Sequence, residues 1–285
     1  MSVNFATLQG LSIPEGVVTQ ITDASGRVIW AVQSGGNVIL EVKKITSNTY
    51  AGETTYNNEQ FILLDIYPKT NGTVKVTYGG LTKTITDTSG VAEPNAQRVF
   101  FGTFNGVSDS VATPTSGELT IEGDYAAFGC GLFDADSKGI DKLCACVTEI
   151  LDYGTVQYIP ANAFGSINGH CPLTSITLPN SITSIGEYAF YNGSFDGGFA
   201  TELTVPESVK VIESYGFAIY GLKTVTVLAE TPPTPTTTKD EYAILGRTVS
   251  SNFVLEKITV PTGRGEAYKA AKGWSEYANL IVEAS

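Results

Sequence analysis

The sequence contains little of what most enzymes use for chemistry. Its 285 residues include one histidine, one methionine, two tryptophans and four cysteines. The single histidine, His170, excludes sites that need several imidazole ligands and leaves room for one triad at most. His170 adjoins Cys171, but adjacent side chains rarely face each other, and no oxyanion-donor motif lies nearby. We therefore expect no catalytic residue and no hydrolase activity on common glycosides or esters.

Basic residues are also scarce. The chain has 17 Lys and Arg against 29 Asp and Glu, for a net charge of −12. This balance argues against binding to nucleic acid or to an anionic membrane. No apolar run reaches the roughly 18 residues that a spanning helix needs, so we expect no membrane insertion. The first 16 residues, MSVNFATLQGLSIPEG, lack the basic and apolar regions of a signal peptide.

The cysteines and acidic residues do not form a metal-site pattern. No CxxC pair occurs, so we expect no zinc site and four free, structural thiols. The segment Asp134–Asp141 resembles the start of a calcium loop. However, Lys138 stands where a ligand belongs, and Ala145 stands where the closing Glu belongs. We interpret the segment as an acidic turn and expect no metal and no cofactor. The four cysteines are Cys130, Cys144, Cys146 and Cys171.

The chain does contain an internal repeat. Leu173–Phe190 (LTSITLPNSITSIGEYAF) returns without gaps, 27 residues later, as Ala200–Phe217 (ATELTVPESVKVIESYGF). A more degenerate copy, Val147–Phe164, lies 26 residues earlier. Two further strand segments come after these copies, Leu222–Val227 and Leu255–Pro261. Periods of this size indicate a solenoid, in which stacking of neighbouring units buries the apolar faces.

The repeat predicts one strand and one turn in each unit. Ile176 and Leu178 alternate with polar residues, as in a strand with one buried face, and Pro179 ends the strand. We expect the strands of all five units to form one parallel sheet. Its stacked inward residues would be Ile176, Leu203, Val225 and Ile258. The turn residues expected to stack in columns are Val156, Ile159, Phe164, Ile182, Ile185, Phe190, Val209, Ile212 and Phe217.

The N-terminal half reads as β-structure. Val17–Val32 predicts a hairpin, which needs a partner because an isolated hairpin is marginal in water. After the linker Ser34–Gly36, seven strand-like runs lie between Asn37 and Phe133. Seven short strands in about a hundred residues are typical of an immunoglobulin-like sandwich. Its expected core is Val38, Leu40, Val42, Leu64, Ile66, Val74, Val76, Phe101 and Ile121.

The repeat pattern LxxIxLPxxIxxIGxxAF resembles the BspA-like, or Treponema-type, leucine-rich repeats. Val260–Val282 is similar to the terminator that often closes these arrays. The resemblance spans Val147–Ser285 and implies a capped leucine-rich-repeat solenoid and a surface location. The stretch LSIPEGVVTQITDASGRVIW resembles the leading segment of some phage tail-associated proteins. The strands between Asn37 and Phe133 are loosely similar to small bacterial surface sandwiches of the PEGA type.

We thus predict a mainly β protein in four segments. These are residues 1–36 (lead and hairpin), 37–133 (immunoglobulin-like sandwich), 134–146 (linker) and 147–285 (solenoid with C-terminal cap). The expected function is non-enzymatic recognition or adhesion, with a protein or glycan as ligand. The resemblances leave open a bacterial surface adhesin, a phage tail-associated receptor-binding protein, or an accessory module of a glycan-active enzyme. Each implies an extracellular, cell-surface or virion location.

Two outward features repeat and are the candidate binding sites. One is a threonine column on the exposed face of the strands, which alternatively is only a solvated surface. The other is a series of tyrosines in the loops, which alternatively only pack between units. The hairpin would attach the molecule to a carrier. The candidate binding residues are Thr177, Thr204, Thr226, Thr259, Tyr191 and Tyr220.

Overall fold

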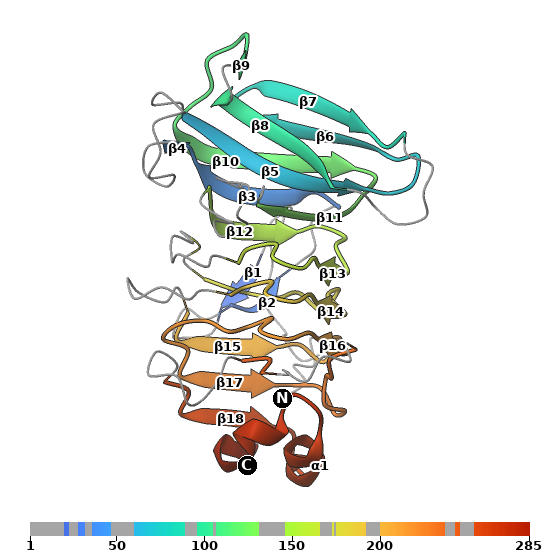
Figure 1. Cartoon of the computed structure of the whole chain (residues 1–285), viewed down its shortest axis with the longest axis vertical. Helices are drawn as coiled ribbons and strands as arrows, with labels where there is room; N and C mark the ends of the chain where they lie inside the picture. The colour runs from blue at the N-terminus through green and yellow to red at the C-terminus, as the bar shows by residue number, and fades with distance from the viewer. Residues whose placement is uncertain are drawn as a thin grey trace, which may run out of the picture.

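The structure is a computed structural model of the whole chain. It describes residues 20–22, 28–31, 36–46, 60–88, 96–104, 107–130, 146–165, 173, 175–191, 200–236, 243–245 and 254–285. Two antiparallel sheets lie at one end of an elongated molecule, and a column of parallel strands closed by a short helix lies at the other (Figure 1).

The N-terminal half is built from two sheets. The first has the order β12 (Val147–Tyr153), β3 (Val38–Lys43), β10 (Ser116–Gly123), β6 (Thr73–Tyr78), β7 (Leu81–Thr86). The second has the order β11 (Tyr125–Cys130), β5 (Gln60–Pro68), β8 (Gln97–Phe104), β9 (Val107–Ser108), with β4 (Ile45–Thr46) also paired to β5. All seven runs predicted from the sequence are strands. The turns at Asn71-Gly72 and Gly79-Gly80 have positive φ at Asn71 and at both residues of the second pair.

The two sheets share a core, but their strand order differs from that of an immunoglobulin domain. All nine predicted core residues are at most 1 % exposed. Tyr78 of β6 and Phe101 of β8 meet edge to face across the layers, with ring centroids 5.7 Å apart. In immunoglobulin domains the first strand pairs with the second. Here β3 pairs with β10, while the late strand β11 pairs with β5, so an immunoglobulin-like arrangement is not confirmed.

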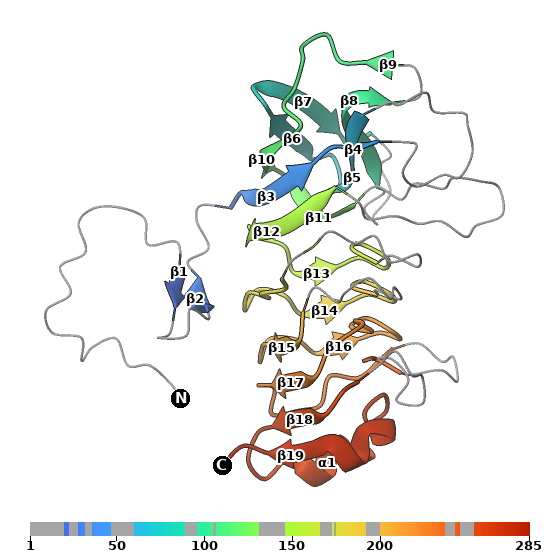
Figure 2. The ribbon, with the colours of Figure 1, turned by 90° about the vertical axis from the view of Figure 1, so that its left-hand side faces the viewer.

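The column of strands contains two parallel sheets (Figure 2). One is β13 (Tyr158–Ile159), β14 (Ser184–Ile185), β16 (Val211–Ile212). The other is β15 (Glu202–Val205), β17 (Thr224–Val227), β18 (Lys257–Val260), β19 (Ile281–Glu283). Short parallel strands stacked on two sides of a shared core make this half a β-solenoid of about four turns.

The prediction of one sheet containing all five strand segments is wrong. Leu203, Val225 and Ile258 are buried and in register, but the segment of Ile176 forms no strand, although Ile176 itself is buried. The reason lies in the first unit. Val147–Tyr153 pairs antiparallel with β3, with two register shifts, and so offers no parallel ladder for the next unit to continue. The strand β19, which sequence reasoning missed, closes the other end of the sheet.

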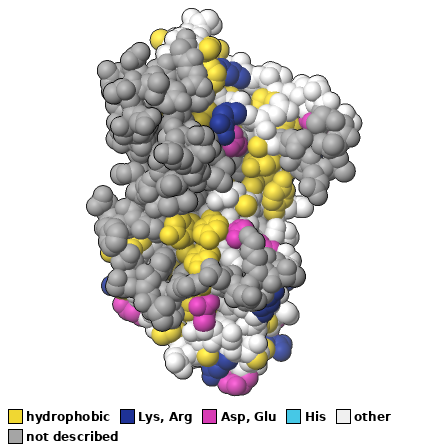
Figure 3. All heavy atoms as spheres, in the orientation of Figure 1, with side chains coloured by type: hydrophobic (Ala, Val, Ile, Leu, Met, Phe, Trp, Pro, Cys, Tyr) yellow, Lys and Arg dark blue, Asp and Glu magenta, His cyan; other side chains and the backbone are white. Residues whose placement is uncertain are grey.

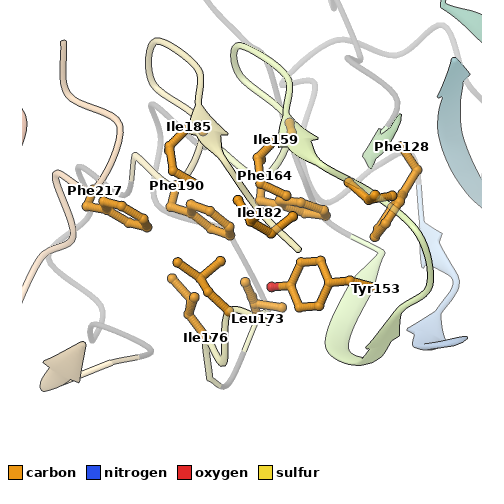
Figure 4. Close-up of a cluster of buried hydrophobic side chains, with 14 of the residues drawn as sticks. Phe128, Tyr153, Ile159, Phe164, Leu173, Ile176, Ile182, Ile185, Phe190 and Phe217 are labelled. Atoms are coloured by element: carbon orange, nitrogen blue, oxygen red, sulfur yellow. The ribbon is translucent and has the colours of Figure 1, made fainter. Parts of the chain in front are cut away.

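The turn residues form the predicted columns (Figure 4). All nine of them are at most 1 % exposed. Phe164, Phe190 and Phe217 stack with successive centroid distances of 5.4 Å. Phe128 of β11 continues the column into the sandwich, 5.7 Å from Phe164, and the Cys130 amide donates to the carbonyl of Ala163. The sandwich and the solenoid therefore share one apolar core.

A C-terminal cap covers the last unit. It contains α1 (Gly265–Ala270) and a 3₁₀ helix, η3 (Ser275–Leu280). Trp274 and Tyr277 are buried. Trp274 Nε1 donates to the carbonyl of Pro233 (2.6 Å), and the hydroxyl of Tyr277 accepts from the amide of Leu245 (3.0 Å). The cap thus satisfies polar groups while it removes apolar surface from water.

The N-terminal hairpin forms as predicted from β1 (Gln20–Thr22) and β2 (Val28–Ala31), with Ile21 opposite Trp30. It stands beside the solenoid in Figure 2. The expectation of four free thiols is wrong for Cys130, which is disulfide-bonded. Cys146 is a buried free thiol. Spacing along the chain could not reveal the bond, because it depends on which thiols the fold brings together. Cys144 and Cys171 lie outside the described residues.

Candidate recognition surface

The outward face of the four-stranded parallel sheet carries the predicted threonine column. Thr204, Thr226 and Thr259 lie directly opposite one another on β15, β17 and β18. Thr204 is exposed and the other two are half-buried. Their neighbours along each strand point into the core, because side chains alternate across a strand. Among the described residues, none of the three hydroxyls makes a hydrogen bond.

Charges of both signs border the threonines. Glu202, Thr224 and Lys257 form the adjacent outward row, and Lys223 and Glu256 form an exposed ion pair of 3.8 Å beside it. Exposed pairs of this kind contribute little to folding. On the face shown in Figure 3, the acidic and basic side chains that are drawn in colour are also interspersed.

Two apolar side chains on the same outward face were missed by the sequence reasoning. Leu228 continues the alternation of Thr224 and Thr226, and it is 49 % exposed. Val282 lies opposite Thr259 and is 42 % exposed. The alternation along TVTVL could have identified Leu228. The outward face therefore combines hydroxyls, balanced charges and two exposed apolar side chains, which is the mixed character of a protein-binding surface.

An open groove lies at the end of this face. It has a volume of about 440 Å³ and is lined by Asn180, Glu207, Ser208, Lys210 and Leu228. Leu228 belongs to both the sheet face and the groove. The ammonium group of Lys210 donates to the carbonyl of Glu207 (2.9 Å), which holds the lysine side chain against the wall.

The predicted tyrosine series is a packed cluster. The rings of Tyr188 and Tyr215 stack in parallel, 5.1 Å apart, and Tyr191 meets both edge-on. All three are half-buried. Tyr188 and Tyr215 have φ near +57°, as does Asn162 at the same repeat position. Because bulky residues rarely adopt this conformation, stacking and the turn hydrogen bonds must offset its cost.

The other candidate residues lie apart from the threonine row. Thr177 is exposed, but its segment is outside the sheet. Tyr220 is half-buried in the turn before β17. The structure therefore brings together Thr204, Thr226 and Thr259 in one place and Tyr191 with its two neighbours in another. His170, Cys171 and the acidic segment Asp134–Asp141 lie outside the described residues.

Buried ionisable groups in the described ranges belong to the core. Burial raises the pKa of the Cys146 thiol to about 12, so the thiol stays protonated and unreactive near neutral pH. Burial likewise raises the pKa of Tyr153, whose hydroxyl points into the apolar cluster of Figure 4. Within the described ranges, no three His, Cys, Asp or Glu side chains are grouped to hold a metal ion. None of the helices described there is long and apolar enough to cross a membrane.

Comparison with known proteins identifies the repeats. Residues 142–262 match the family described as BspA type Leucine rich repeat region, in six copies. No curated protein matches the chain. The match does not extend to the N-terminal half, so its resemblance to phage tail-associated proteins is not supported. Repeats of this family are typically non-enzymatic protein-interaction modules, and proteins that carry them are usually surface-associated. Residues 142–262, which span most of the solenoid, are therefore similar to BspA-type leucine-rich-repeat regions.

Proposed function

We propose that the protein is a non-enzymatic recognition protein that adheres to a protein or glycan outside the cell that encodes it. Its binding surface is the outward face of β15, β17, β18 and β19. The observation that carries this proposal is the row of Thr204, Thr226 and Thr259, whose hydroxyls make no hydrogen bond within the described fold. An inward residue is needed for stacking, whereas these outward residues remain available for a ligand.

The rigidity of the sheet supports this choice over the loops. Each strand is hydrogen-bonded to the next, and Glu283 of the final strand accepts hydrogen bonds from the amides of Gly263 and Gly265 at the start of the cap. A rigid surface loses little conformational entropy when a ligand binds, so more of the contact energy appears as affinity. The face is also nearly neutral in charge, which favours a ligand recognised by hydrogen bonds and apolar contact.

The test is a pair of substitutions on the face. Thr204→Arg with Thr226→Arg places two long cations in the centre of the proposed interface without changing the core. Wild-type protein is screened against a panel of purified extracellular proteins and glycans, and the retained ligand is measured by biolayer interferometry. We expect the variant to bind at least about tenfold more weakly, equal to about 1.4 kcal/mol.

The matched control makes the same two Thr→Arg substitutions on another sheet. Thr84→Arg with Thr120→Arg alters the outward positions of β7 and β10 in the sandwich. This control should bind as the wild type does. A folded Thr204/Thr226 variant that retains full affinity would place the binding site elsewhere.

The hairpin supports a second part of the proposal, attachment to a carrier. Its two strands form a sheet of their own, with Ile21 and Trp30 opposed. Two-stranded sheets are marginal in water and gain stability from an added strand. Removal of residues 1–33 should leave ligand binding unchanged while it abolishes incorporation into the carrier assembly, measured by co-sedimentation.

A further inference from the structure

The groove beside the sheet has a specific structural origin. In the two gap-free copies of the repeat, a proline is followed by an Asn-Ser or Glu-Ser pair, at Pro179 and Pro206. The register of β15 with β17 places Leu228 where these units have proline. The chain then continues to Thr234, whose amide donates to the carbonyl of Lys210 (3.2 Å). Leu228 is 49 % exposed and lines the space beside Glu207.

The lining combines few but varied groups. The amide of Asn180 can both donate and accept hydrogen bonds, the carboxylate of Glu207 accepts, and the ammonium of Lys210 donates. Lys210 is held by its bond to the Glu207 carbonyl, and its own backbone bonds to Thr183 and Thr234. The carboxylate and the ammonium cancel in charge. The hydroxyl of Ser208 is buried and so is not counted among the contacts.

These groups match a ligand with many hydroxyls, no net charge and one apolar face. A pyranose ring has that character, because its hydroxyls donate and accept while its C–H face packs on apolar side chains. A single anionic or cationic group would meet one opposite and one like charge in this groove, so its binding would gain little. The volume of about 440 Å³ lies within the range of small-molecule sites.

We propose that this groove binds one neutral pyranose unit of a glycan. The ring packs against Leu228, and its hydroxyls hydrogen-bond with Asn180, Glu207 and Lys210. This site rests on the proposed recognition function and gives it a ligand class. Because Leu228 also belongs to the sheet face, the rest of the glycan extends over the threonine row.

The test uses the full chain and the methyl glycosides of glucose, galactose, mannose and N-acetylglucosamine. Saturation-transfer NMR should detect at least one of them with Kd of about 1–10 mM. Asn180→Ala with Glu207→Gln should weaken that binding about tenfold or more, and Leu228→Asp should do the same by removing the apolar contact. Glu118→Gln, at an exposed position of β10 in the sandwich, is the matched control and should leave Kd unchanged.

Two results would overturn the site. One is the absence of binding by every glycoside up to about 50 mM, far above the Kd range expected. The other is binding that none of the groove variants weakens. Either result leaves the recognition function standing if the Thr204/Thr226 variant still loses a protein ligand from the panel. Conversely, glycoside binding lost in the groove variants supports the site even where the sheet variant behaves as wild type.

Discussion

Phe190→Ala is the change that examines the stacked core most sharply. Phe190 is fully buried between Phe164 and Phe217, with both centroids 5.4 Å away. Truncation removes the ring and leaves a cavity that neighbours on both sides can fill only by breaking their own stacking. A substitution of this type costs about 3–5 kcal/mol, and the position between two rings places it near the upper end.

The assay is urea unfolding followed by far-ultraviolet circular dichroism. With a slope of about 3 kcal/mol per molar urea, a loss of about 4 kcal/mol lowers the midpoint by about 1.3 M. The sandwich should unfold in the same transition, because Phe128 continues the column into β11. Phe190→Leu fills part of the cavity and should cost less, about 1–1.5 kcal/mol.

Val111→Ala is the control, since Val111 is 53 % exposed on the sandwich. It should change the free energy of unfolding by no more than about 0.5 kcal/mol. If Phe190→Ala lowers the free energy of unfolding by less than about 1.5 kcal/mol, the aromatic column does not stabilise the solenoid as argued. Two separate transitions would refute the shared core.

Two further predictions concern the cap. Trp274→Ala should lower stability by about 3–5 kcal/mol because it opens a buried site and orphans the carbonyl of Pro233, and chemical denaturation measures this loss. Glu283 accepts hydrogen bonds from the amides of Gly263 and Gly265, which lower its pKa below 4.5. Its stabilising contribution is complete above the pKa of the unfolded chain and is lost as pH falls through the folded pKa. The difference in Tm between wild type and Glu283→Gln should therefore be constant near neutral pH and shrink below about pH 4.5; a pH-independent difference would contradict the assignment.

The columns of the solenoid could be predicted because each unit repeats the same local rule. Phe164, Phe190 and Phe217 are predictable from spacing alone, since stacked units place equivalent residues above one another. The seven strands of the N-terminal half could be predicted from short runs of strand-like sequence, although their order in the two sheets could not.

The features that could not be predicted depend on pairing between distant segments. Val147–Tyr153 looks like a first repeat, yet its backbone bonds to β3, more than a hundred residues earlier. Nothing within the sequence VTEILDY distinguishes a parallel strand of the solenoid from an antiparallel strand paired with β3. The groove likewise brings Leu228 beside Asn180, Glu207 and Lys210, which lie between about 18 and 48 residues earlier in the chain. The threonine row was predicted, but Val282 joins it only because β19 pairs with β18.

Hydroxyl-radical footprinting of the full chain, free and bound to the ligand retained from the panel, tests the recognition surface most directly. Leu228 and Val282 report on the sheet face, whereas Val107 and Val111 report on the sandwich, and all four are between 42 % and 58 % exposed. We predict that ligand binding reduces the oxidation of Leu228 and Val282 and leaves Val107 and Val111 unchanged. Protection of Val107 and Val111 with unaltered oxidation of Leu228 and Val282 would show that the solenoid sheet is not the binding surface.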